Sequence, residues 1–122
     1  MEIVEICRAE GWTSFYADPE RTWRVLNAPG VTSVAAVDRG QVVGFAYLQS
    51  DGEIQAHLSN IAVSRSHRRR GIARRLIEEA FARCGAMRID LVSTESSEEF
   101  YRSFEHREFP GFRIYPRRER SK

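Results

Sequence analysis

Six arginine side chains gather in one short stretch of this sequence, where they could bind an anion. They are Arg65, Arg68, Arg69, Arg70, Arg74 and Arg75, and no acidic residue interrupts them. Gly71 lies among them, and a glycine ahead of a helix lets a phosphate approach backbone N–H groups that carry partial positive charge. Guanidinium groups add charge-assisted hydrogen bonds to phosphate oxygens. The stretch therefore predicts a phosphate site, and the alternative is a solvated basic loop.

Tyr101 and His57 are among the side chains that could move protons. A phenol with an ordinary pKa of about 10 can act as a proton donor, and an imidazole with an ordinary pKa of about 6.5 can accept a proton near neutral pH. Glu53 and Asp51 stand at the turn before His57 and are second choices for the base. The structural alternatives are a half-buried helix aromatic for Tyr101, a hydrogen-bonded strand histidine for His57, and ordinary turn residues for the two carboxylates.

The hydrophobic pattern predicts a mixed α/β (α+β) fold with a mostly antiparallel sheet, flanked by helices. Helices are expected over residues 2–9, 19–27, 71–83 and 95–103. Strands are expected over residues 31–37, 41–49, 53–63, 87–92, 104–109 and 112–115. The predicted order of elements is therefore ααβββαβαββ.

Local signals fix several boundaries of these elements. Asp18 followed by Pro19 is typical of a helix N-cap with proline in the first helical position. Arg39-Gly40 predicts a tight turn between the first two strands. The apolar parity changes between Leu58 and Ile61, which predicts a bulge in the third strand. We expect that strand to run antiparallel to the second.

The composition predicts one soluble globular domain over residues 1–122. The chain is 42% hydrophobic and 30% charged, so a core can form without disulfides. No apolar run approaches the roughly 18 residues that a membrane helix needs. Met1 leads into Glu2 and Glu5 rather than into a basic and then apolar leader, which favours a cytoplasmic location. The charged end from Arg117 to Lys122 is expected to be solvated.

Charge balance and the reactive side chains argue against several kinds of chemistry. A net charge of +2 is too small to indicate a nucleic-acid partner by itself. Lys122 is the only lysine, so no internal lysine can form a Schiff base. Cys7 and Cys84 are far apart and are expected to be buried, reduced thiols. Neither His67 nor His106 has a metal-ligand spacing, so no metal site is expected.

Beyond these separate signals, the arginine-rich stretch resembles a family motif. Arg68-x-x-Gly71-x-Ala73 is similar to the R/Q-x-x-G-x-G/A pyrophosphate motif of the GNAT superfamily of N-acetyltransferases. As in that family, it lies between a strand and an amphipathic helix. Further on, Phe100-Tyr101 and Gly111-Phe112 resemble the second cofactor-binding segment of the family, so the likeness spans about residues 31–115. Two departures are a missing first strand at the N-terminus and a longer stretch between Tyr101 and Gly111.

The resemblance implies a single GNAT-like domain whose sheet is splayed at a cleft for acetyl-CoA or another acyl-CoA. Backbone groups of the third strand would pair with the pantetheine arm, and amides of the basic loop would hold the pyrophosphate, with Arg68 and Arg69 as side-chain partners. Thr94 stands about where the family often has an asparagine that contacts the cofactor arm. The cofactor-binding residues implied are Ile61, Ala62, Val63, Arg68, Arg69, Arg70, Gly71, Ile72, Ala73, Arg74, Thr94 and Tyr101.

The resemblance also implies direct acetyl transfer to a primary amine of a small molecule or a peptide. Tyr101 matches the family tyrosine that protonates the leaving thiolate. Ala56-His57-Leu58-x-x-Ile61 resembles the strand of arylalkylamine N-acetyltransferases in which a histidine assists deprotonation, and other members carry a glutamate at that position. The aromatic residues of the N-terminal helices either wall the acceptor pocket or pack in the core: Trp12, Phe15, Tyr16 and Trp23.

Three classes of function are consistent with these features. The first is an acetyl-CoA-dependent N-acetyltransferase, which Tyr101 and His57 favour because a sensor needs neither an acid nor a base. The second is a non-catalytic acyl-CoA sensor or interaction module of the same fold. The third is a nucleic-acid binder that uses the arginine-rich stretch. Dimers are frequent in the family, and the oligomeric state of this chain stays open between a monomer and a homodimer.

Overall fold

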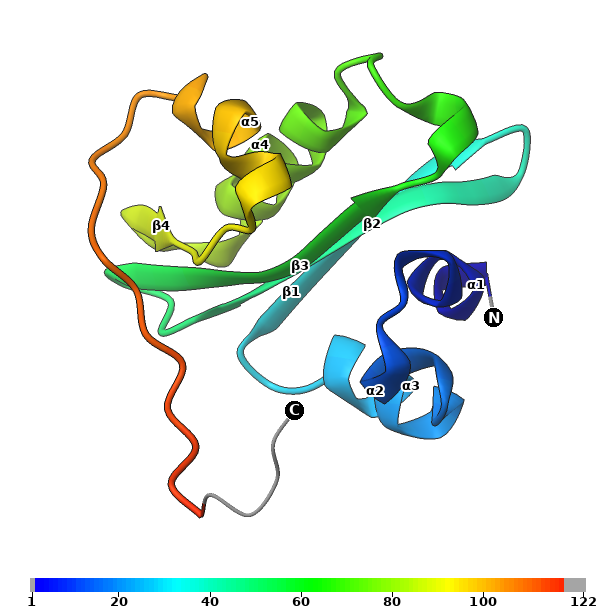
Figure 1. The fold of residues 1–122 in the computed structure, drawn as a ribbon, viewed down its shortest axis with the longest axis horizontal. Helices are drawn as coiled ribbons and strands as arrows, with labels where there is room; N and C mark the ends of the chain where they lie inside the picture. The colour runs from blue at the N-terminus through cyan, green and yellow to red at the C-terminus, as the bar shows by residue number, and fades with distance from the viewer. Residues whose placement is uncertain (1, 118–122) are drawn as a thin grey trace. The chain divides into compact units, whose positions relative to one another are not determined.

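The computed structural model describes residues 2–117 and divides the chain into two compact units, residues 1–91 and residues 92–122. The first unit contains the sheet. Its strands are β1 (Val31–Asp38), β2 (Gln41–Ser50), β3 (Gln55–Val63) and β4 (Arg88–Asp90), in the order β1-β2-β3-β4 (Figure 1). The first three pair antiparallel and β4 runs parallel to β3, which confirms the mixed, mostly antiparallel sheet. The solvated end expected from Arg118 to Lys122 lies outside the described residues.

The hairpin between β1 and β2 forms as predicted. Arg39 and Gly40 both have positive φ angles, 54° and 81°, and Asp38 pairs with Gln41 across them. Two consecutive left-handed residues match the twist of antiparallel strands in a two-residue turn. The turn therefore sets the register of the hairpin.

The predicted bulge in β3 lies at Ser59. Tyr47 pairs with Asn60 but Leu48 pairs with Leu58, which leaves Ser59 as the extra residue. The bulge changes the parity of the strand: Ala62 lies beside Phe45, whereas His57 lies beside Gln49. Both pairs share one face of the sheet, because Phe45 and Gln49 are four residues apart on the same strand.

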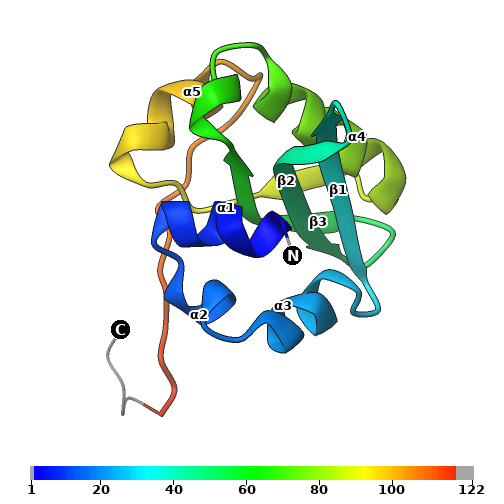
Figure 2. The ribbon, with the colours of Figure 1, turned by 90° about the vertical axis from the view of Figure 1, so that its right-hand side faces the viewer.

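Helices cover both faces of this sheet (Figures 1 and 2). On one side lie α1 (Glu2–Glu10), α2 (Thr13–Tyr16) and α3 (Pro19–Leu26), and on the other lies α4 (Ile72–Cys84). The core cluster on the first side is Ile6, Cys7, Leu26, Phe45, Tyr47 and Ala62. On the second side, a methyl group at Gly44 would lie 3.2 Å from the Ala62 carbonyl oxygen and 3.5 Å from Leu76. Glycine at this position therefore lets α4 approach the sheet closely.

The N-terminal region confirms the two predicted helices and the Asp18 cap, and it adds the short helix α2. Asp18 caps α3 by accepting a hydrogen bond from the Arg21 N–H at 3.1 Å. The single turn α2 was not predicted, because its four residues are too few to show a helical period. Trp12 meets Phe45 edge-on at 6.4 Å between ring centroids, and Phe15 lies 6.2 Å from Tyr47. These two aromatics thus pack on the core, whereas Trp23 is exposed.

Both cysteines are free and buried. Burial, with a smaller effect of the Glu10 charge, raises the pKa of the Cys7 thiol to about 11. A thiol that stays protonated at neutral pH is a poor nucleophile.

In residues 2–117, no helix has the length and apolar character needed to cross a membrane. The expected cellular location and the single domain over residues 1–122 stay predictions.

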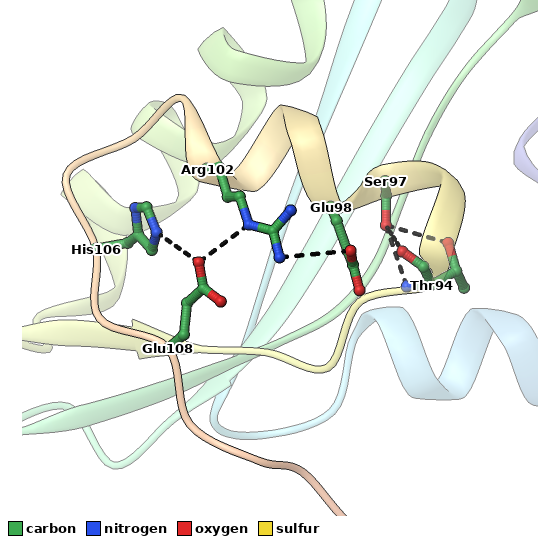
Figure 3. A network of polar contacts seen from close by, with 6 residues as sticks. All are labelled: Thr94, Ser97, Glu98, Arg102, His106 and Glu108. Atoms are coloured by element: carbon green, nitrogen blue, oxygen red, sulfur yellow. Dashed lines mark hydrogen bonds and ion pairs between the residues drawn. The ribbon is translucent and has the colours of Figure 1, made fainter.

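The second unit is built around a short helix. A 3-10 turn (Glu95–Ser97) leads into α5 (Glu98–Arg102), and these two replace the single helix expected over residues 95–103. Figure 3 shows Thr94 and Ser97 forming a reciprocal cap. Arg102 then pairs with Glu98 at 3.5 Å and with Glu108 at 3.0 Å.

The strands expected over residues 104–109 and 112–115 are wrong for the structure as described. Neither segment pairs with a strand, so the observed order ends after α5. A strand needs a hydrogen-bonded partner, and residues 92–117 contain none. Glu108 instead connects the first segment back to α5. The expected strand over residues 87–92 is also shorter, Arg88–Asp90.

The ion pairs that follow α5 predict a local pH dependence. The Phe104 carbonyl and Glu108 raise the pKa of His106, and Arg102 and His106 lower the pKa of Glu108. The stabilisation that His106 contributes is complete below its unfolded pKa of 6.5 and is lost as pH rises through its higher folded pKa. The stabilisation that Glu108 contributes is complete above its unfolded pKa of 4.5 and is lost as pH falls through its lower folded pKa.

Amide protection factors in residues 103–109, measured by hydrogen exchange, should therefore be highest between about pH 4.5 and 6.5 and lower on either side. The effect should be small because the groups are fully exposed. Glu108→Gln should flatten the profile, and an unchanged profile in that variant would contradict the assignment.

Candidate functional site

The loop between β3 and α4 has the backbone of an anion site. Arg69 and Gly71 both adopt left-handed conformations, with φ of 64° and 79°. Left-handed residues in such a loop turn neighbouring N–H groups toward one concave surface. Gly71 immediately precedes Ile72, so the first amides of α4 have no acceptor within the helix. A methyl group at Gly71 would meet nothing within 4 Å, so the space beside this glycine is open.

Arg68 lies at the start of this loop, but its guanidinium is bound to the protein. Its Nε donates to the Val63 carbonyl oxygen at 2.9 Å, and its terminal nitrogen donates to a Glu10 carboxylate oxygen at 2.7 Å. The side chain thus connects the end of β3 to the end of α1. In this structure Arg68 positions the loop, and its expected contact with a pyrophosphate stays a prediction.

Residues that sequence reasoning did not assign also hold the loop in place. His67 Nε2 lies 2.9 Å from an Asp38 carboxylate oxygen, and its Nδ1 lies 2.9 Å from the Ser66 hydroxyl. Asp38 belongs to the β1–β2 hairpin, far from His67 in sequence, so no local pattern indicates this pair. Arg69 and Arg70 are exposed, and one terminal nitrogen of Arg70 lies 3.4 Å from the Ser66 carbonyl oxygen.

β3 and β4 are splayed next to the bulge. They pair only from Gln55 opposite Arg88 to His57 opposite Asp90. β4 then ends, while β3 continues to Val63, so within residues 2–117 that edge of β3 has no further strand partner. An unpaired edge can accept an extended, amide-containing chain as an added strand. Of the three residues predicted to contact such a chain, Ile61, Ala62 and Val63, the last has its carbonyl oxygen bound to Arg68.

His57 lies at the point where the two strands separate. Its side chain is exposed, and its lateral neighbours are Gln49 on β2 and Asp90 on β4. The Gln49 side-chain nitrogen donates to the hydroxyl of the bulge residue Ser59 at 2.8 Å. Residues in register across a sheet share a face, so Gln49, His57 and Asp90 form one row.

The two alternative bases lie in the turn before β3. Asp51 accepts hydrogen bonds from the N–H groups of Ile54 and Glu53, both at 2.7 Å, and these bonds lower the pKa of its carboxyl group. Asp51 is therefore a turn residue, as the structural alternative held. Glu53 is exposed in the same turn and stays a predicted second choice.

A hollow of about 460 Å³ opens beside this row. It is lined by Gln49, Ser50, Asp51, Gln55, Ala56, His57 and Asp90. A second hollow of about 330 Å³ lies between α1 and the loop after β3. Sequence reasoning missed Asp90 because a lone aspartate at a strand end carries no motif. In residues 2–117, no group of His, Cys, Asp or Glu side chains could hold a metal ion.

Tyr101 and Thr94 belong to the second compact unit, whereas His57, Glu53 and the loop belong to the first. Tyr101 lies on α5, half-buried, with its ring centroid 5.0 Å from that of Phe100. Burial raises the pKa of its phenol, so the group keeps its proton at neutral pH. The Thr94 hydroxyl lies 3.1 Å from the Ser97 hydroxyl, so in this structure Thr94 is a helix cap.

Comparisons with solved structures show the same fold. A candidate acetyltransferase from Deinococcus radiodurans R1 aligns with a TM-score of 0.71 at 26% identity, over 80% of this chain and 68% of that one. A ribosomal-protein-alanine N-acetyltransferase from Brucella melitensis biovar Abortus 2308 aligns at 0.74 and 17% identity, over 93% and 89%. AAC(6')-Iy, in complex with the bisubstrate analogue CoA-S-monomethyl-acetylneamine, aligns at 0.67 and 21% identity, over 86% and 80%.

Family membership follows from the sequence itself. No curated protein matches the chain. The family model described as the acetyltransferase (GNAT) family matches residues 1–105, which confirms the resemblance based on the Arg68-x-x-Gly71-x-Ala73 motif. The protein belongs to the GNAT family of acetyltransferases.

Proposed function

We propose that this chain is an N-acetyltransferase that moves the acetyl group of acetyl-CoA to a primary amine of a small molecule or peptide. The observation that carries the proposal is the left-handed loop at Arg69 and Gly71, which lies directly after the open edge of β3. The loop suits a pyrophosphate and the strand edge suits a pantetheine arm, so the residues present fit CoA. The neighbour bound to a CoA bisubstrate analogue supports the same assignment.

The chain's own groups divide the work of binding. Loop amides from Arg69 to Arg74 would bind the pyrophosphate, with the Arg69 side chain adding charge. Ile61 would bind the pantetheine amides through its backbone, and Val63 would contribute its N–H, because its carbonyl oxygen is held by Arg68. Arg68 and His67 would keep the loop in position through Glu10 and Asp38.

The reaction needs a neutral amine and a protonated leaving group. The amine nitrogen attacks the thioester carbonyl carbon, an N–C bond forms, and the C–S bond breaks. His57 would take the proton that the ammonium loses before attack, with Glu53 as second choice. Tyr101 would give its phenol proton to the leaving sulfur, because burial keeps that proton bound at neutral pH. The nitrogen loses its second proton as the amide forms, and that proton would restore the Tyr101 phenol.

Calorimetric titration with acetyl-CoA, with free CoA as the comparison, tests the binding step. Micromolar binding followed by thiol release on addition of primary amines would support the enzyme. Binding without release by any amine would favour the sensor, and the absence of binding by folded protein would overturn both.

Gly71→Leu should weaken acetyl-CoA binding at least about tenfold, because the side chain would occupy the space in front of the loop amides. Gly11→Leu is the matched control. Gly11 and Gly71 have the same φ of 79° and nothing within 4 Å of an added Cβ, so both variants should lose about 1–2 kcal/mol of stability. Equal acetyl-CoA affinity in the two variants would contradict the loop assignment.

A further inference from the structure

Asp90 is a carboxylate beside the predicted base that neither the motif nor the mechanism uses. It stands opposite His57 in the parallel pair of β3 and β4, on the face that His57 shares with Gln49. Parallel neighbours lie about 4.8 Å apart, so a small group bound to one residue is within reach of the other. Asp90 therefore lies where an ammonium group that gives its proton to His57 would bind.

The hollow around Asp90 favours a cation. No arginine or lysine is among its lining residues, whereas two aspartates are. Arg88 lies two residues before Asp90 on the same face of β4, opposite Gln55, and its charge acts on Asp51. The lining of the hollow itself carries two carboxylates and no guanidinium group.

The two aspartates in the hollow differ in what they can still bind. The Asp51 carboxylate already accepts from three backbone N–H groups, those of Glu53, Ile54 and Gln55. Asp90 accepts one side-chain hydrogen bond, from Gln55 Nε2 at 3.2 Å, and forms no ion pair within the part of the chain that the structure describes. A carboxylate can accept several hydrogen bonds, so Asp90 keeps room for an ammonium donor.

Gln49 completes the arrangement from the other side of His57. Its side-chain nitrogen is used by Ser59, which leaves its carbonyl oxygen as the available acceptor. An ammonium group carries three N–H donors, and the row offers a carboxylate, an imidazole and an amide oxygen. This set of acceptors is complementary to a primary ammonium group.

We propose that Asp90 is the residue that binds the acceptor amine in its ammonium form, beside His57, and thereby selects cationic primary amines over neutral ones. The inference rests on the proposed acetyl transfer for its catalytic consequence. The binding step can be measured without it. Asp90 holds the charge, and His57 then takes the proton that must leave before the nitrogen attacks.

The binding test is an NMR titration of the protein with phenethylamine hydrochloride at neutral pH. We expect amide shifts at residues 55–57 and 88–90 in the wild type and their loss in Asp90→Asn. Asp51→Asn is the matched control, since it removes the same charge from the same hollow while its amide oxygen can still cap the turn. Loss of binding in both variants would show a general charge effect and would overturn a specific role for Asp90, as would the absence of shifts in the wild type.

The kinetic test compares phenethylamine with an aniline that is neutral at pH 7. Asp90→Asn should raise KM for phenethylamine about 10- to 100-fold and leave KM for the aniline and the affinity for acetyl-CoA unchanged. Equal effects on both acceptors would overturn charge selection. Failure of the proposed acetyl transfer would give a different result, because the wild type would then release no thiol with any amine. The NMR titration would still decide whether Asp90 binds an ammonium group.

Discussion

Tyr101→Phe should lower kcat by about 10²- to 10³-fold and leave the dissociation constant of acetyl-CoA unchanged, because general-acid groups typically contribute about 10²- to 10⁴-fold. The variant removes one oxygen and keeps the ring that packs against Phe100. Burial raises the pKa of the phenol, so the proton is present throughout the neutral range. Without this phenol proton, the sulfur must leave as a thiolate or take a proton from water. Single-turnover thiol release measures this step directly.

Tyr115→Phe is the matched control for Tyr101→Phe. It makes the same change in the same compact unit, at a tyrosine that is exposed. Its kcat should equal that of the wild type. Wild-type turnover in Tyr101→Phe would remove Tyr101 as the acid and leave it as a packing residue of α5.

Features encoded by neighbouring residues were predicted well. The Arg39-Gly40 turn, the Asp18 cap and the bulge between Leu58 and Ile61 each depend on backbone preferences or on side-chain parity within a few residues. The same is true of the glycine before α4, whose left-handed conformation belongs to a short motif. Local physics fixes these features, so a single sequence contains them.

Features that depend on distant partners could not be predicted. The Arg68 side chain contacts Glu10 and the Val63 carbonyl, which no local pattern indicates, and its pyrophosphate contact stays a prediction. The extended segments around Phe109 and Ile114 have strand-like residues, yet strand formation needs a partner that residues 92–117 lack. Asp90 became a candidate only once the register of β4 placed it opposite His57.

His57→Ala should lower kcat/KM for an alkylamine about 10- to 100-fold at pH 7 and by much less near pH 10. An alkylammonium has a pKa of about 10, similar to that of lysine, so at neutral pH the acceptor must lose a proton before it attacks. In the proposed mechanism the imidazole would take that proton from an ammonium group bound beside Asp90, one of the two lateral neighbours of His57. At high pH the amine is already neutral, and the base is no longer needed.

The slope of the pH profile separates this role from a structural one. A histidine that only stabilised β3 would, when removed, reduce activity by one factor at every pH. An aniline acceptor that is neutral at pH 7 provides the internal comparison, because His57→Ala should leave its acetylation nearly unchanged. His106→Ala, which removes an exposed histidine from the other compact unit, should leave both profiles as in the wild type. A uniform loss in His57→Ala with both acceptors would transfer the role of base to another group, with Glu53 the next to test.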